Sequence, residues 1–291
     1  MPTLRSLLFF AFVSLTGFAI AAPDSPLKTE VTTLFRGGKW DEARAVCEKA
    51  LAADPKNAEA QFYLGMSYLS RNDYEHATPE LEKATELAPT NSEYFRRLGE
   101  AYGSTAQNAG LFSKMSWAKK CKAAFEKAVE LDPKNIRARQ SLMDYLRQAP
   151  GIAGGSMEQA YVQAAEIQKL DLNQGRIAYA TLYVVEKKYN EAFAIYEDVL
   201  KQKPDDYAAL YAIGRLSAVS GERLDQGVDA LKKCLAAKAP DGQPGPAPVN
   251  WRLGNIWEKK GDKAAAKSAY EAALAVDPNF SQAADALKKL Q

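Results

Sequence analysis

The chain has 291 residues, of which 47% are hydrophobic and 25% are charged, a composition that excludes widespread disorder and predicts a folded protein. It carries 38 basic and 36 acidic residues, a formal net charge of +2 at pH 7. Such a balanced chain offers no strong field to nucleic acid or to an anionic membrane surface, so we expect no nucleic-acid partner.

Residues 1–21 have the features of a secretory signal peptide. Arg5 precedes an apolar run at 7–18, and Ala-Ile-Ala at 19–21 fits the small-x-small cleavage rule. The alternative is an uncleaved anchor, but the run is shorter than the ~20 residues that a spanning helix needs. We expect cleavage after Ala21, which leaves residues 22–291 as an exported chain without an integral membrane segment.

Short phrases then recur along the chain. Each ends one helical pattern, contains a proline and a polar residue, and begins the next helix. Pro55 and Pro89 are 34 residues apart, which is the period of one class of helix-turn-helix repeat. Proline ends the preceding helix and suits the opening of the next. The phrases are LAADPKNAEA (51–60), ELAPTNSEY (86–94), ELDPKNIRA (130–138), KQKPDDYAA (201–209) and AVDPNFSQA (275–283).

Small and large residues alternate within each unit as two packed helices require. In residues 58–89, Leu64, Gly65 and Tyr68 share a face of the first helix, and Ala77 and Leu81 share a face of the second. The small residues are expected where the two helices cross closely. The same pattern recurs at Leu98, Gly99 and Tyr102, and again at Leu253, Gly254 and Trp257.

This pattern resembles the tetratricopeptide repeat, which reads Trp-x-x-Leu-Gly-x-x-Tyr, then Ala-x-x-x-Phe, then Pro. The second, third, fifth and seventh units match well, the first (about 24–57) matches in its second helix, and the fourth has Leu172 where Pro would stand. The resemblance implies an all-α solenoid of about seven helix-turn-helix repeats over 22–291, with a C-terminal capping helix at 280–290.

Three insertions interrupt the period, near 104–116 and 149–157 between the helices of the third and fourth units, and near 240–248 between the sixth and seventh. Insertions of this kind tend to lie on one face and often serve binding. The second, PGIAGGSM, lacks the lysine of a phosphate-binding loop. We therefore interpret it as an inter-helix turn, with Ser156 capping the next helix.

Catalytic and metal chemistry are not indicated, and we expect neither an enzyme nor a bound cofactor or metal. His76 is the one histidine, so it has no histidine partner for a metal site or for a catalytic set. Cys47, Cys121 and Cys234 occupy interior positions of predicted second helices, where thiols are usually inert.

A partner would bind along the concave side, which the first helices of such an array line. Tyr, Trp and Arg dominate the binding energy of such interfaces. By spacing, the side chains expected to face this groove are Phe62, Met66, Arg96, Arg137, Gln140, Asp144, Thr181, Tyr211, Arg215, Trp251 and Asn255. One subgroup of the family holds a C-terminal carboxylate with Lys and Asn on adjacent first helices, and the residues found here at those places do not support that mode.

The first functional hypothesis is a non-catalytic exported scaffold that binds a protein or peptide in its groove and aids the assembly or regulation of an envelope complex. The second is an accessory or catalytic protein that acts on an envelope polymer through the inter-helix insertions. A third is self-association through a terminal repeat. The simple signal peptide, with this repeat type, favours the periplasm of a Gram-negative bacterium.

Overall fold

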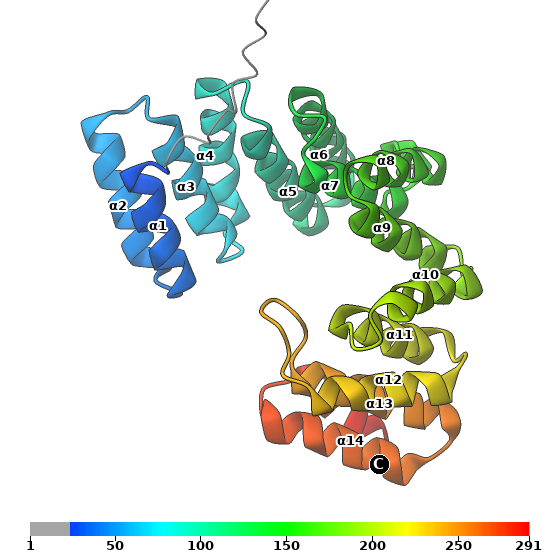
Figure 1. The fold of residues 1–291 in the computed structure, drawn as a ribbon. Helices are drawn as coiled ribbons and strands as arrows, with labels where there is room; N and C mark the ends of the chain where they lie inside the picture. The colour runs from blue at the N-terminus through cyan, green and yellow to red at the C-terminus, as the bar shows by residue number, and fades with distance from the viewer. Residues whose placement is uncertain (1–23, 291) are drawn as a thin grey trace, which may run out of the picture.

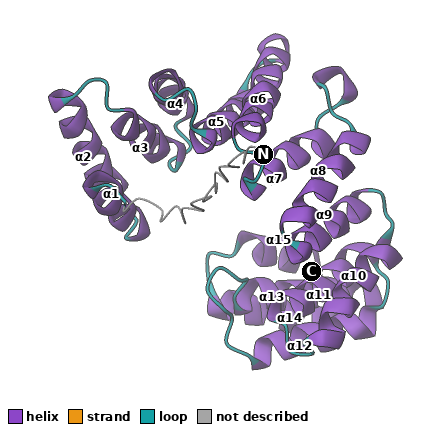
Figure 2. Ribbon diagram, turned by 45° about the horizontal axis from the view of Figure 1, so that its top comes forward, coloured by secondary structure: helices purple, strands orange, loops and turns teal. Residues whose placement is uncertain are grey.

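A computed structural model describes residues 24–290, so the predicted signal peptide lies outside the described residues. The described chain forms fifteen α-helices and one short 3-10 helix, with no strand (Figures 1 and 2). Consecutive helices pack in seven pairs, and a last helix covers the final pair, as predicted. The pairs are α1 (Pro26–Arg36) with α2 (Trp40–Ala53), α3 (Ala58–Leu69) with α4 (Tyr74–Leu87), α5 (Ser92–Asn108) with α6 (Leu111–Leu131), α7 (Ile136–Gln148) with α8 (Met157–Leu170), α9 (Leu172–Val185) with α10 (Tyr189–Gln202), α11 (Tyr207–Ser220) with α12 (Leu224–Ala236), and α13 (Pro246–Lys260) with α14 (Lys263–Val276); the 3-10 helix η1 is Gly151–Ala153 and the last helix is α15 (Ser281–Leu290).

The turns between repeats share one local structure. At the first, α2 ends at Ala53, and the side chain of Asn57 accepts a hydrogen bond from the Ala60 N–H at the start of α3 (2.9 Å). Pro55 lies in the turn between them, where its missing N–H costs no helical hydrogen bond. Asn91, Asn135 and Asp206 cap α5, α7 and α11 in the same way.

The fourth repeat ends without a proline, and a single residue replaces the usual turn. Asp171 alone separates α8 from α9. Its carboxylate accepts hydrogen bonds from the N–H groups of Asn173 (2.9 Å) and Gln174 (3.0 Å), which are among the free donors of the α9 amino end.

The two helices of a repeat cross at a glycine, as predicted. A Cβ atom added at Gly65 would lie 2.7 Å from Cγ of Leu81, and one at Gly254 would lie 2.7 Å from Cζ of Tyr270. Both large side chains are fully buried, so they fill the space that the glycine leaves. Gly99 with Phe125 and Gly214 with Leu231 repeat this arrangement.

The array curves with its first helices on the inner side (Figure 1). First helices of successive repeats contact each other from α1 to α9 and again between α11 and α13, whereas successive second helices lie further apart. A stack of pairs that is closer along one row than along the other must bend toward the closer row. The concave face is therefore built by the odd-numbered helices.

The first insertion lengthens two helices and forms almost no loop. Only residues 109 and 110 separate α5 from α6, which have 17 and 21 residues, whereas α3 and α4 have 12 and 14. Good helix formers (Ala, Gln, Leu, Lys and Met) make up six of the thirteen residues at 104–116, and the extra residues add helical turns. At 1.5 Å per residue, they carry the ends of α5 and α6 about 7–10 Å beyond the neighbouring pair.

The second insertion is a compact turn around η1. The Ser156 N–H donates to the Leu146 carbonyl (2.8 Å), and the Tyr145 hydroxyl donates to the Ala153 carbonyl (2.7 Å). A Cβ at Gly155 would lie 2.6 Å from the carbonyl carbon of Ala149, so only glycine fits there. Ser156 caps α8 by accepting the Gln159 N–H (3.2 Å), as predicted.

The third insertion lies at the other edge of the array. It occupies the loop 237–245 between α12 and α13, and α13 begins at Pro246, within the predicted segment. The Tyr207 hydroxyl anchors the loop by donating to the Pro244 carbonyl (2.6 Å). The first two insertions follow first helices and the third follows a second helix, so the three do not share one edge.

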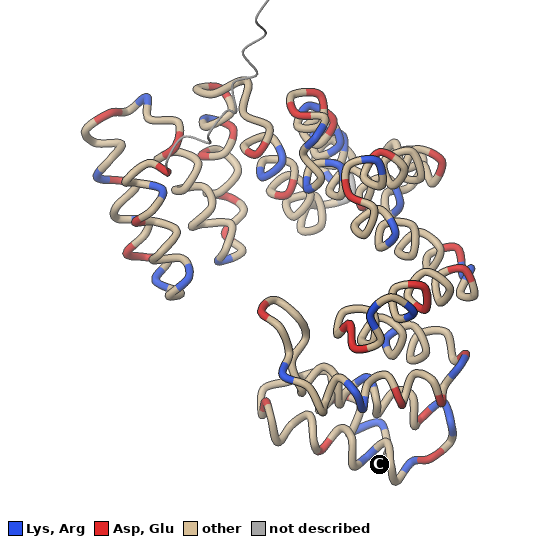
Figure 3. The backbone as a smooth tube through the Cα atoms, viewed as in Figure 1, with Lys and Arg blue, Asp and Glu red and all other residues tan. Residues whose placement is uncertain are grey.

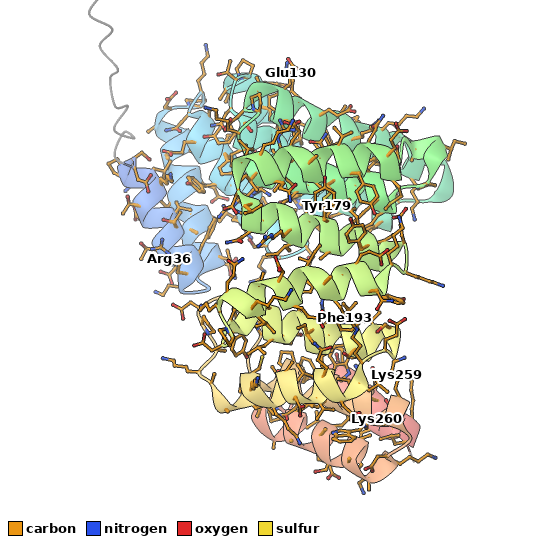
Figure 4. All side chains as sticks on the ribbon, turned by 45° about the vertical axis from the view of Figure 1, so that its right-hand side comes forward. Arg36, Glu130, Tyr179, Phe193, Lys259 and Lys260 are labelled. Carbon is orange, nitrogen blue, oxygen red and sulfur yellow. The ribbon has the colours of Figure 1, made fainter. Side chains whose placement is uncertain are left out.

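The buried core is divided into three clusters along the array. One runs from Val31 on α1 to Leu182 on α9, the next from Ala180 on α9 to Ile256 on α13, and the last joins α14 to α15. Figure 4 labels Tyr179 on α9 and the fully buried Phe193 on α10, on either side of the first division. The α9–α11 pair also lacks the close contact seen between other first helices. None of the helices in residues 24–290 has the length and apolarity needed to cross a bilayer.

Candidate functional site

All eleven residues predicted for the groove lie on first helices, from α3 to α13. The structure brings only some of them together. Phe62, Met66 and Arg137 line one hollow of about 480 Å³ formed by α1, α3, α5 and α7, within the size range of ligand pockets. The other residues that line it, and that spacing within single repeats did not reveal, are Lys28, Thr32, Phe35, Glu59, Tyr63, Asn91, Glu93, Tyr94 and Arg97.

Aromatic rings form the apolar wall of the hollow. Phe62 stacks on Tyr94 of the next repeat, with ring centroids 4.3 Å apart and planes 14° apart, and Tyr63 meets Phe62 edge-on at 5.2 Å. Phe62, which was predicted to face the groove, lines this hollow but is only 7% exposed. Its ring therefore supports the wall and does not project from it. Desolvation, with a smaller effect of the nearby Glu59 carboxylate, raises the pKa of Tyr94 to about 12. Its phenol therefore stays neutral at physiological pH.

A closed network of four charges lies beside this wall on α5. Arg96 and Arg97 both pair with Glu93 and with Glu100, including Arg97 Nε to Glu93 Oε1 at 3.0 Å and Arg97 Nη1 to Glu100 Oε2 at 2.9 Å. Arg96, which was predicted to face the groove, is 5% exposed and paired with two carboxylates, so it offers a ligand little free surface. The spacing of three and four residues on one helix produces these pairs.

The network also fixes the ionisation of its carboxylates. Desolvation disfavours the charged form of Glu93, but its hydrogen bonds and ion pairs with Arg96 and Arg97 prevail and hold its pKa below the usual range. Two arginines and two glutamates cancel in charge, and Figure 3 shows acidic and basic residues interspersed along the whole array. The concave face thus carries no extended field of one sign.

Arg137 and Met66 are the groups of the hollow that are most available to a ligand. Arg137, on α7, is exposed and has no ion pair among the described residues. Met66, on α3, is half-buried, and its flexible thioether adapts to irregular apolar surfaces. The hollow therefore combines an aromatic wall, an adaptable apolar side chain and one unengaged cation.

Three predicted residues on α7 and α9 are engaged within the chain. The Gln140 amide donates to the Gln174 amide (3.2 Å), Asp144 accepts a hydrogen bond from Arg147 (2.7 Å), and the Thr181 hydroxyl donates to the Ile177 carbonyl (2.9 Å). These contacts occupy part of their hydrogen-bonding capacity.

On α13 the predicted residues pack toward the C-terminus. Trp251 meets Phe280 edge-on at 5.9 Å with Arg252 over its ring at 4.1 Å, and Asn255 accepts a hydrogen bond from the Tyr270 hydroxyl (2.8 Å). Both side chains thus support the last repeat and the capping helix. Tyr211 and Arg215 on α11 are half-buried and exposed, respectively, so they are the accessible predicted residues of this end.

The remaining chemistry-bearing residues lie apart from the hollow. The three cysteines are buried in second helices, as predicted, and burial raises their pKa values to about 12, 12 and 11 for Cys47, Cys121 and Cys234. His76 is exposed on α4 with Nδ1 2.8 Å from Asp73. Within residues 24–290, no three His, Cys, Asp or Glu side chains gather as a metal site would require.

Comparison with known families identifies the repeats. Models described as tetratricopeptide repeat match residues 34–99, 109–135 and 247–280. These segments cover the whole second repeat, nearly all of the seventh, and parts of the first and third. No curated protein matches the sequence.

Solved structures share the architecture. A tetratricopeptide repeat protein from Parabacteroides merdae superposes with a TM-score of 0.67 at 14% identity, covering 91% of this chain and 97% of that one. Yeast Tom70 gives 0.65 at 13% identity, covering 94% of this chain and 58% of its own. Human IFIT1, solved as a dimer with m7Gppp-AAAA, gives 0.62 at 17% identity, covering 90% and 61%. At these identities the likeness concerns the fold alone.

Proposed function

Because this chain is a tetratricopeptide repeat protein, we propose that it is a non-catalytic scaffold that binds a peptide segment of a protein partner in its concave groove. The observation that carries this proposal is the hollow of about 480 Å³ between α1, α3, α5 and α7. It joins first helices of four successive repeats, which gives an extended segment a continuous surface. Export and a role in an envelope complex, with the periplasm as location, complete the proposal and rest on the signal-like residues 1–21.

The chemistry of the hollow favours a segment with an apolar or aromatic side chain next to an acidic group. The Phe62–Tyr94 stack and Met66 offer apolar contact, and Arg137 offers a forked donor for a carboxylate. The paired charges on α5 add no further attraction for an anion, because each arginine there already has its carboxylates. An RNA ligand, as in the IFIT1 structure, is not proposed, because a phosphate backbone needs several free cations.

The alternative of an enzyme acting at the insertions has one observation in its favour, a cleft near 104–116 with Asp73, Glu75 and Glu82 among its lining residues. A general acid would need a raised pKa. Hydrogen bonding to His76 instead lowers the pKa of Asp73, and Glu82 is engaged in an ion pair with Lys120 at 3.5 Å. The cleft is therefore better suited to binding than to proton transfer.

Selection of peptides from a random display library on the purified protein tests the groove. We expect enriched sequences that combine an aromatic or aliphatic residue with an acidic one. In calorimetry, Arg137→Ala should lower the affinity for a selected peptide by about tenfold, because it removes a hydrogen bond to a charged group. Met66→Ala should weaken it less, and Lys83→Ala, an exposed change on the second helix α4, should leave the affinity unchanged.

Two results would contradict the proposal. One is a library that yields no enriched sequence. The other is a set of selected peptides that bind the Arg137→Ala and Met66→Ala variants as tightly as the unaltered protein, because the hollow would then not be the binding surface.

A further inference from the structure

A second concave site lies away from the groove, where the lengthened helices of the third repeat overhang the second (Figure 1). A cleft of about 770 Å³ opens between α4 and the ends of α5 and α6. The extra turns of α5 and α6 build it, because they extend past the neighbouring pair. Its lining residues are Asn72, Asp73, Tyr74, Glu75, Thr78, Pro79, Glu82, Thr105, Asn108, Ala109 and Trp117.

Contacts between the repeats hold the walls of this cleft in place. The Tyr102 hydroxyl on α5 donates to Glu82 on α4 (2.6 Å), and Lys120 Nζ on α6 lies 3.5 Å from the same carboxylate. The hydroxyls of Thr78 and Thr105 are 3.3 Å apart across the same seam. The cleft is therefore pre-formed, which lowers the cost of ordering on binding.

The lining combines an aromatic platform with neutral hydrogen-bonding groups. Trp117 is half-buried and presents an apolar ring with a polar N–H, and Tyr74 provides a second ring. Asn72, Asn108 and the threonines supply both donors and acceptors, and the carboxylates supply acceptors only. No lysine or arginine lines the cleft, and Lys120 at its edge already pairs with Glu82 and lies 4.6 Å from the centre of the Trp117 ring. The lining residues therefore offer no free cation to a phosphate or carboxylate ligand.

The carboxylates are already largely matched within the protein. Glu82 has Lys120 and Tyr102, and Asp73 has His76 beside it. A basic ligand would have to compete with these internal partners.

The Thr78, Thr105 and Tyr74 hydroxyls already bond within the protein. Among the described residues, the groups that remain for a ligand are the Asn72 amide N–H, the Asn108 amide oxygen, the Glu75 carboxylate and the Trp117 N–H. Beside the aromatic rings, these donors and acceptors suit the hydroxyl groups of a sugar ring with an apolar face.

We propose that this cleft binds a neutral saccharide chain, with a sugar ring lying against Trp117 and its hydroxyls bonded to the amide and carboxylate side chains of α4 and α5. This site is independent of the peptide groove. The cleft is on the edge of the array formed by within-repeat turns, and the hollow is on the concave face between first helices.

Nuclear magnetic resonance of the purified protein tests the proposal with two soluble β-1,4-linked probes, cellopentaose and chitopentaose. The indole N–H signal of Trp117 is assigned by its loss in Trp117→Phe. We expect at least one probe to shift this signal. Trp117→Ala should lower the affinity for that probe by about tenfold. Asn108→Ala, an exposed change at the end of α5, should also weaken binding of that probe, and Lys119→Ala on α6, the helix of Trp117, should not.

Three results would overturn the proposal. The first is that neither probe shifts the Trp117 signal. The second is that a probe binds the Trp117→Ala and Asn108→Ala variants as tightly as it binds the unaltered protein. The third is a salt-sensitive shift of the Trp117 signal with hexalysine and none with the sugars, which would assign the cleft to a basic peptide.

Discussion

Replacing Gly254 by alanine tests the close helix crossing that the second, third, sixth and seventh repeats share. The added Cβ would lie 2.7 Å from Cζ of Tyr270 and closer still to two other ring carbons, well inside the ~3.5–4.0 Å of ordinary carbon contact. Tyr270 has no room to move, because it is fully buried and its hydroxyl donates to both Asn255 and Glu258. The ring or the helix must therefore shift.

The expected change is the balance of two effects. Overpacking of a rigid core site destabilises the fold by about 1–3 kcal/mol, whereas replacing a glycine in a helix interior by alanine stabilises the helix by about 1 kcal/mol. We expect Gly254→Ala to lower the free energy of unfolding by about 0–2 kcal/mol in urea titrations followed by circular dichroism. Hydrogen exchange should place the loss in α13, α14 and α15, because repeats communicate only with their neighbours.

Gly103→Ala is the matched control on α5. A Cβ there meets only the Cys121 sulfur, at 3.3 Å, so the gain in helix propensity should prevail and stability should stay level or rise. A second check is Gly254→Ala in a Tyr270→Leu background, where the alanine should cost less than it does alone. If Gly254→Ala stabilises the protein as much as Gly103→Ala does, the crossing is not as tight as described.

Three further predictions concern burial, charge and the end of the array. The three cysteines should resist a thiol reagent at about pH 8 and react when urea unfolds the chain, because burial keeps their pKa values at about 11–12. A fast reaction of the native protein with the reagent would refute this prediction. Since the folded pKa of Glu93 is lowered, its charge stabilises the fold above the unfolded pKa of ~4.3 and this contribution is lost as the pH falls through the folded pKa. The Tm difference between the unaltered protein and Glu93→Gln should thus be largest near about pH 7 and shrink toward about pH 3, and a constant difference would argue against the network. Deleting residues 281–290 should expose the apolar side of α14 and raise binding of a hydrophobic dye, whereas unchanged dye binding would show that α15 is not a cap.

The fold could be predicted from the sequence because each repeat carries its own signals. Prolines mark most turns, and glycine opposite a large residue marks the crossing in four repeats, as Gly65 and Leu81 show. Units with weak signals still fold into the array. Asp171 replaces the proline turn of the fourth repeat with a carboxylate cap, and a neighbouring repeat supplies the contacts that a weak unit lacks.

The candidate sites were harder to predict, because they arise between repeats. Phe62 is buried by the stacking of Tyr94 from the next repeat, a contact that spacing within one unit cannot reveal. The pairing of Arg96 could have been anticipated, since Glu93 and Glu100 stand three and four residues away on the same helix. The cleft beside Trp117 depends on how far α5 and α6 project beyond α4, which follows from the helical form of the first insertion.

The division of the core at α9 has a mechanical consequence. The α9–α11 pair lacks the close contact seen between other neighbouring first helices, and the buried core divides there, so we expect this junction to be the most compliant point of the array. A force applied to the two ends of the array would extend it at this junction first. The two halves would then keep their own shapes while the span between them adjusted to the length of whatever bridges them.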